Sequence, residues 1–365
     1  IIRLAAPSKY QVAVVNTTYN PSKKTKVFGE IALSNNDANL FSSIDDSENK
    51  GLATKLQWEQ IFIDKKWKMS TAIDYSFIHQ NFATEQRFDA VEFRRDWNVV
   101  NPLGNRNQIS AQFILDNKQN SKYIYGFNLL NYSDTYNGIK HDFNSQTKLK
   151  NIKINSFISV LNSNSTVETN TFLRAKGKVE HSFSNSWIGG FINVETNKIT
   201  TKSNQQLSKL SHQFKEYETY IGLGDSAKVY AKIGFNYRLN DSIRNNAFTK
   251  INSRKTYYIN SKILQNSTTN LAVFANYRVT NNAFSTNEKA LNSKIVYGQK
   301  LFKNFINLNT VYETSSGNIP RQEYVYIKTE PGQGYYTWID YNNNGIKEFN
   351  EFEIAIYKDQ AEYLR

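Results

Sequence analysis

The chain has 365 residues, with 45 Lys and Arg against 32 Asp and Glu, so its formal net charge is +13. It contains no Cys, which excludes disulfides, Cys-ligated zinc and a thiol nucleophile. The charge suits contact with an acidic surface such as lipopolysaccharide. Because the basic residues are spread evenly and form no run, we expect no nucleic-acid partner.

The dominant pattern along the chain is a strict alternation of apolar and polar residues, which is typical of β-strands that present a different environment on each face. Strands of about ten to fourteen residues follow one another through short polar turns, and their spacing predicts about sixteen to eighteen of them. The clearest examples are segments 67–77, 123–129, 152–155, 227–238, 271–278 and 291–298.

Longer connections are expected at 34–50, 202–211 and 280–288, and 205–214 is the one helical candidate. No run approaches eighteen apolar residues, so we predict no transmembrane helix. The predicted fold is therefore all-β, an antiparallel meander of long strands, most simply an outer-membrane β-barrel or a large part of one.

In such a barrel the apolar side chains face lipid and the polar ones a watery lumen. Aromatic residues near strand ends would form interfacial girdles, here Trp58, Trp67, Tyr132, Trp187, Tyr237 and Trp338. The alternative is a soluble or surface-exposed β-rich module, in which two sheets cover each other's apolar faces and the aromatics pack a core. That module would bind glycan or lipopolysaccharide through aromatic and Lys side chains.

Segment 92–97 (Glu-Phe-Arg-Arg-Asp-Trp) holds closely spaced charges. It is either an ion-pair cluster that faces the lumen, a surface contact, or a solvated strand end. The chain carries no phosphate-loop, dinucleotide, zinc-protease or serine-hydrolase motif. We therefore expect no catalytic residue, no organic cofactor and no enzyme activity, although the separation of carboxylate pairs is not readable from sequence.

Segment 340–351 fits the spacing of a twelve-residue calcium loop. Oxygen-bearing side chains occupy positions 1, 3 and 5, Gly345 occupies position 6, and carboxylates occupy positions 9 and 12. The predicted Ca²⁺ ligands are the side chains or backbone oxygens of Asp340, Asn342, Asn344, Ile346, Glu348 and Glu351. Both flanks look extended rather than helical, so we expect a calcium-stabilised loop rather than a sensor; the alternative is an Asn/Gly-rich turn without metal.

Segments 331–353, 91–97 and 222–226 resemble parts of large outer-membrane β-barrel proteins of Bacteroidota. The resemblance implies an outer-membrane location in a Gram-negative bacterium and a role beside secretion or envelope-assembly machinery, with other envelope proteins as partners. The expected organisation is a barrel region over 1–335 and the calcium-type loop with its flanks over 336–356, and the chain reads as an excerpt of a longer protein.

These observations predict an outer-membrane barrel that acts as a channel, a translocon component or a structural partner in an envelope complex. Outer-membrane lipid and lipopolysaccharide would surround it, and Ca²⁺ would stabilise one loop.

Overall fold

The computed structural model describes residues 7–44, 46–84, 89–133, 135–225, 228–316, 325–329 and 332–365. Ser226, Ala227 and Pro331, which belong to segments singled out above, lie outside these ranges. The chain forms two compact units, Ile1–Gly317 and Asn318–Arg365.

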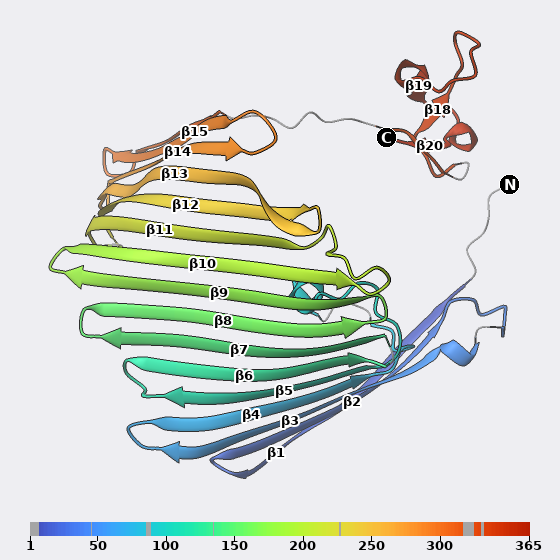
Figure 1. Cartoon of the computed structure of the whole chain (residues 1–365), viewed down its shortest axis with the longest axis horizontal. Coiled ribbons are helices and arrows are strands. Elements are labelled where there is room, and N and C mark those ends of the chain that lie inside the picture. The colour runs from blue at the N-terminus through green and yellow to red at the C-terminus, as the bar shows by residue number, and fades with distance from the viewer. Residues whose placement is uncertain are drawn as a thin grey trace. The chain divides into compact units, whose positions relative to one another are not determined.

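The first unit is a single sixteen-stranded sheet in which every strand pairs with its sequence neighbours, in the order β1 to β16 (Figure 1). Its strands are β1 (Lys9–Ser22), β2 (Thr25–Asp37), β3 (Lys50–Asp64), β4 (Lys68–Ile78), β5 (Arg106–Asp116), β6 (Ser121–Tyr132), β7 (Tyr136–Leu149), β8 (Ile152–Ser165), β9 (Glu168–Phe183), β10 (Ser186–Thr201), β11 (His212–Gly224), β12 (Tyr230–Arg244), β13 (Ala247–Gln265), β14 (Thr269–Asn282), β15 (Glu288–Leu301) and β16 (Ile306–Ser315).

All fifteen pairings are antiparallel, and β1 and β16 stand at the two edges of the sheet. This confirms the predicted fold class, an all-β antiparallel meander of long strands. The layout fits that of an outer-membrane barrel, whose strands also follow one another in simple up-and-down order.

The helical candidate at 205–214 does not form a helix. This stretch belongs to the connection between β10 and β11, and β11 begins at His212. The Ser211 hydroxyl lies 2.9 Å from the backbone nitrogen of Ile199 and 3.1 Å from its carbonyl oxygen, and Leu207 forms a bridge to Thr200. Backbone hydrogen bonds from Ser208 N–H to the Ile199 carbonyl and from Thr201 N–H to the Gln206 carbonyl, both 2.9 Å, also pair the segment with the end of β10 in place of helical hydrogen bonds.

The connections differ between the two ends of the sheet. At one end none exceeds five residues: 23–24, 65–67, 117–120, 150–151, 184–185, 225–229, 266–268 and 302–305. The other end carries three much longer ones, at 38–49, 79–105 and 202–211, beside the shorter 133–135, 166–167, 245–246 and 283–287. Short turns at one end and longer loops at the other are a property of outer-membrane barrels.

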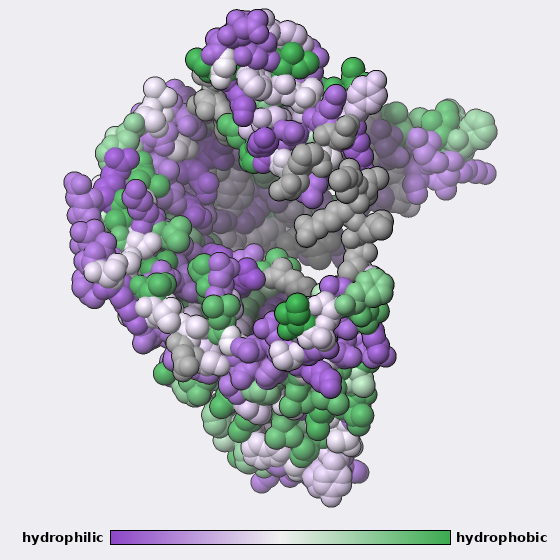
Figure 2. All heavy atoms as spheres, turned by 90° about the vertical axis from the view of Figure 1, so that its right-hand side faces the viewer, coloured by the Kyte–Doolittle hydropathy of each residue, from purple (hydrophilic) through white to green (hydrophobic). Residues whose placement is uncertain are grey.

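The strand register places one set of side chains on each face of the sheet, because successive residues of a strand point to opposite sides. On the outward face, Ile192 of β10 is 50% exposed and Ile233 of β12 is 55% exposed. Further exposed apolar side chains on this face are Ile73, Phe113, Ile158, Ile188, Tyr217, Ile221, Tyr257 and Leu291. The inward face carries most of the charged side chains of the strands, and Figure 2 shows hydrophobic residues gathered on the lower part of the first unit.

The proposed aromatic girdle needs correction at three positions. Tyr132 and Trp187 lie on the inward face and are buried, while Trp338 belongs to the second unit. Trp58 and Tyr237 do lie in the outward rows of β3 and β12. The alternation of a strand fixes a side chain's face only once the register is known, which the aromatic content alone does not reveal.

Glycines on the inward face accommodate tyrosine rings from the neighbouring strand. A Cβ atom at Gly234 would lie 2.4 Å from Cζ of Tyr258, whose hydroxyl is hydrogen-bonded to Glu218. Gly234→Ala should therefore destabilise the fold by about 1–3 kcal/mol through overpacking. Gly177→Ala, also in mid-strand but with no heavy atom within 4 Å of the new Cβ, is the matched control and should be neutral or slightly stabilising. Urea unfolding of the two variants measures the difference, and equal midpoints would contradict it.

The second unit is a small four-stranded sheet of β17 (Ile327–Lys328), β18 (Tyr336–Trp338), β19 (Phe352–Ile354) and β20 (Tyr363–Leu364). Its centre is aromatic: Tyr326 stacks on Phe352 with ring centroids 4.0 Å apart, and Tyr363 meets Phe352 edge-on at 5.0 Å. Because β17 pairs with β20, the unit begins before the boundary at 335 that the sequence suggests. No helix among the described residues is long and apolar enough to cross a membrane.

Candidate functional site

A short helix, α1 (Phe93–Trp97), lies on the inward face of the large sheet. It belongs to the long connection between β4 and β5 and ends where Asn98 adopts a left-handed conformation (φ 49°). Trp97 is only 3% exposed. With Val99, it packs against inward-facing side chains of β6 to β9, namely Leu130, Tyr132, Tyr136, Leu161 and Phe172.

Ion pairs hold the same helix to the wall. Arg95 Nη2 lies 2.8 and 2.9 Å from the two carboxylate oxygens of Glu195 on β10, and Glu195 also accepts from His212 at 3.0 Å. Asp96 pairs with Arg174 of β9 at 2.5 Å. Burial alone would lower the pKa of Arg95, but the hydrogen bond and charge of Glu195 outweigh it and the pKa is raised, so this guanidinium stays charged.

Two hydrogen bonds and a cation–π contact complete the attachment. The Tyr136 hydroxyl donates to the Trp97 carbonyl, and the Lys140 ammonium lies 4.5 Å from the centre of the Trp97 ring. Asn197 donates to Asn98 at 3.4 Å. Of the alternatives for segment 92–97, the structure thus supports the ion-pair cluster on the inner face and not a solvated strand end.

Sequence reasoning missed the partners of this helix. Glu195 and Arg174 lie 100 and 78 residues from Arg95 and Asp96. No local sequence pattern connects residues so far apart. A charged residue that points inward would indicate an ion-pair partner, but which residues point inward is known only once the strand register is known.

Farther along the sheet, the inner wall carries a network of aromatic and charged groups. The Tyr220 hydroxyl donates to Glu180 at 2.9 Å, and Tyr258 donates to Glu218. The Lys232 ammonium lies 3.3 Å from Glu218 and 3.8 Å from the centre of the Tyr220 ring. Carboxylates, an ammonium and tyrosine hydroxyls thus contact one another on this wall, which makes it suited to water and to polar or charged solutes rather than to lipid.

In the second unit, the predicted calcium loop joins β18 to β19, which pair with each other. Asp340 Oδ1 accepts from the backbone N–H of Asn344 at 3.1 Å, and its Oδ2 accepts from Gly345 at 2.8 Å. Asn344 Oδ1 accepts from the N–H of Ile346 at 2.6 Å, and Gly345 has a positive φ of 70°. Asn342 both accepts from Asn344 and donates to Glu348 at 3.0 Å.

The last predicted ligand, Glu351, is 2% exposed. Its Oε2 accepts from the Trp338 indole at 2.9 Å and from the Glu348 N–H at 3.3 Å, whereas its Oε1 is buried without a hydrogen-bond partner. A buried carboxylate oxygen is costly when nothing neutralises it, and a cation would do so. All the predicted donors are oxygens, the ligand type that Ca²⁺ prefers.

The structure does not assemble these donors into a metal cluster. Within the described ranges, no three His, Cys, Asp or Glu side chains gather as they would around an ion. Asp340, Asn342, Asn344 and Ile346 share one hydrogen-bonded turn, and Glu348 and Glu351 share a capping box. Calcium binding at this loop stays a prediction.

No family model and no curated protein matches the chain. Two solved structures of OmpT, an outer membrane protein of Vibrio cholerae, are similar to it. The in-vitro folded form has a TM-score of 0.33 and 7% identity and covers 85% of this chain and 93% of that one. The form expressed in the outer membrane has the same TM-score and identity, with coverages of 87% and 97%. At this TM-score the likeness carries no argument, and the strand topology alone defines the class: a long-stranded antiparallel meander with one apolar and one polar face.

The expectation that the chain is not an enzyme does not stand. The expectation rested on missing local motifs. The fold brings Glu180 of β9, Glu195 of β10, and Glu216 and Glu218 of β11 onto neighbouring inward rows, an arrangement that no local motif reports. The lack of motifs therefore does not establish a lack of activity.

Proposed function

We propose that this chain is an outer-membrane β-barrel, or a large part of one, that acts as a channel, a translocon component or a structural partner in an envelope assembly or secretion complex. The observation that carries the proposal is the division of the sixteen-stranded sheet into an apolar outward face and a charged inward face. Exposed apolar patches of more than a few hundred Å² are rare on soluble monomers, and lipid is the medium that covers a whole sheet face.

The soluble alternative requires a second layer over the outward face. The other described sheet consists of four strands of two or three residues, far too small to cover strands of ten to nineteen residues. A membrane location needs no such partner, and the +13 net charge suits anionic lipopolysaccharide at the surface. The proposed host is a Gram-negative bacterium, in line with the resemblance to Bacteroidota proteins.

Within this proposal the inner helix α1 is a constriction. It occupies the polar side of the sheet, held by Glu195 and Arg174, and so narrows the space through which a solute would pass. The open sides of the edge strands β1 and β16 support the structural-partner role, because unpaired backbone groups accept a further strand.

Planar-bilayer recording distinguishes these roles. Detergent-folded protein that inserts and gives stepwise conductance supports the channel. Protein that inserts into the bilayer but conducts nothing contradicts the channel and leaves the partner role. Protein that fails to insert contradicts the barrel itself.

The proposal includes Ca²⁺ at the 340–351 loop, with Asp340, Asn342, Asn344, the Ile346 carbonyl, Glu348 and Glu351 as ligands. Ca²⁺ would neutralise the unpartnered Oε1 of Glu351 and tie the two ends of the loop together. The few charged ligands predict weak binding, suited to calcium-rich surroundings outside the cytosol.

Asp340→Ala should abolish this binding because it removes the ligand at the first loop position. Trp338, whose indole contacts Glu351, provides the readout, since excited Trp sensitises terbium bound nearby. We expect terbium luminescence that Ca²⁺ displaces, and a Ca²⁺-dependent stabilisation of about 2.7 kcal/mol when its concentration is a hundred times the Kd.

Asn343→Gly is the matched control, because Asn343 occupies a non-ligand position with a positive φ of 56° that glycine adopts readily. It should leave the luminescence unchanged. Equal luminescence from the wild type and Asp340→Ala would show that the loop is a metal-free turn.

A further inference from the structure

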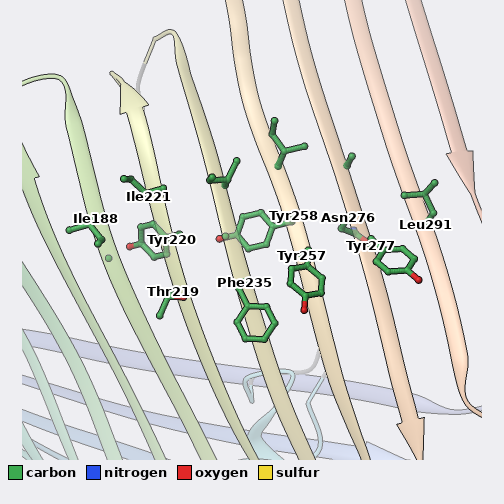
Figure 3. Close-up of a pocket in the computed structure, with 15 residues that line it drawn as sticks. Ile188, Thr219, Tyr220, Ile221, Phe235, Tyr257, Tyr258, Asn276, Tyr277 and Leu291 are labelled. Atoms are coloured by element: carbon green, nitrogen blue, oxygen red, sulfur yellow. The ribbon is translucent and has the colours of Figure 1, made fainter.

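A hollow of about 750 Å³ lies on the outward face of the sheet and crosses β10 to β15 (Figure 3). The strand register explains its form. One wall is a row of outward side chains in direct register, Ile188, Ile221, Ile233, Ile259 and Ala275. The other wall is the next outward row, Thr219, Phe235, Tyr257, Tyr277 and Leu291.

The floor between these walls is backbone. The residues of the intervening row, which include Gly189, Tyr220, Gly234 and Tyr258, belong to the inward set. The two tyrosine rings are held on the inner face by Glu180 and Glu218. No side chain from this row therefore fills the space between the walls, and we call the result the outer groove.

The dimensions of the outer groove select its occupant. Its two walls are two residues apart along each strand, roughly 7 Å, which is too narrow for an α-helix about 10 Å across but suits one hydrocarbon chain. From β10 to β15, at about 4.8 Å per strand, it is roughly 24 Å long. If the strands tilt by about 45°, it spans roughly 17 Å of depth, close to half of a hydrocarbon core about 30 Å thick.

The chemistry agrees with the dimensions. The lining contains no charged residue, and its side chains are aliphatic or aromatic except for Thr219 and Asn276 and the tyrosine hydroxyls. Phe235 and Tyr257 lie with ring centroids 5.0 Å apart and form a continuous aromatic surface along one wall. The groove is continuous with the exposed apolar rows of the outward face, which the proposed function assigns to lipid.

We propose that the outer groove binds a single acyl chain of a membrane lipid and retains it when the surrounding lipids exchange. The inference rests on the proposed membrane location. It adds that one lipid is held at a defined place, between the isoleucine row and the Phe235–Tyr277 row.

The proposal is tested by a substitution that fills the outer groove. Ala275 closes one end of the isoleucine row, and Ala275→Phe places a ring in the groove. The matched control is Ala175→Phe, because Ala175 is also an outward, half-buried alanine in mid-strand, on β9 and outside the groove lining. Wild type and both variants are inserted into phosphatidylethanolamine–phosphatidylglycerol vesicles, extracted in mild detergent and weighed by native mass spectrometry.

We expect wild type and Ala175→Phe to retain one lipid per protein, and Ala275→Phe to retain at least tenfold less. Equal retention by all three proteins would overturn the groove proposal while leaving the barrel intact. Failure of the wild type to insert into the vesicles would overturn the proposed membrane location and the groove with it.

Discussion

Replacing Ile192 with Lys should destabilise the membrane-inserted protein by about 2–4 kcal/mol, the cost of placing Lys on the lipid face near the bilayer midplane. Ile192 lies in the middle of β10, points outward and is 50% exposed. In a protein whose outward face met water, the same change would be neutral or would improve solubility. Unfolding by urea from lipid vesicles measures the free energy.

Asn193→Lys is the control for this prediction. Asn193 is the next residue of the same strand, points inward and donates to Glu216 at 3.3 Å. A lysine there meets a carboxylate on the polar wall and should change the free energy of unfolding by less than about 1 kcal/mol. Similar effects at positions 192 and 193 would contradict the assignment of the two faces.

Trp97→Ala should release α1 from the inner wall. Truncating a buried Trp typically costs about 3–5 kcal/mol, and here the indole is the centre of the only apolar cluster between the helix and the wall among the described residues. The strand ladder does not depend on it, so the sheet should persist. We expect rapid tryptic cleavage at Arg94 or Arg95 and, if the protein is a channel, a larger conductance.

Val100→Ala, at an exposed position of the same connection, controls for a general effect of mutation and should leave cleavage slow. Unchanged protection of Arg94 and Arg95 in Trp97→Ala would show that the ion pairs and the remaining hydrogen bonds hold the helix without the indole. Loss of the whole β signal in circular dichroism would show that α1 supports the sheet rather than lying on it.

The fold could be predicted from the sequence because its signal is local. The alternation of apolar residues with polar residues or glycine, as over 231–238, is read within one strand. Short polar turns between successive strands leave a meander as the simplest topology. Asn245 and Asn246, both with positive φ, form such a turn between β12 and β13. The faces of Tyr132 and Trp187 could not be assigned in this way, because they depend on register.

The candidate sites differ in the same way: a site whose residues are close in the sequence could be predicted, and a site built from distant strands could not. The 340–351 loop was found because its donors lie within twelve residues, and its turn at Gly345 has the expected positive φ. The inner helix was not found, because five residues with two arginines do not make a periodic pattern and its partners come from β6 to β10. The outer groove is invisible in sequence, since its walls exist only when six strands are in register.

The most direct test of the membrane-barrel assignment is fractionation of the native protein, followed by detergent extraction and electrophoresis with and without heating. We predict sedimentation with the outer membrane, release by detergent only, and a heat-dependent shift in mobility as the folded barrel opens. Release into buffer or high salt alone would contradict the assignment and show a soluble β-protein held to the envelope by charge.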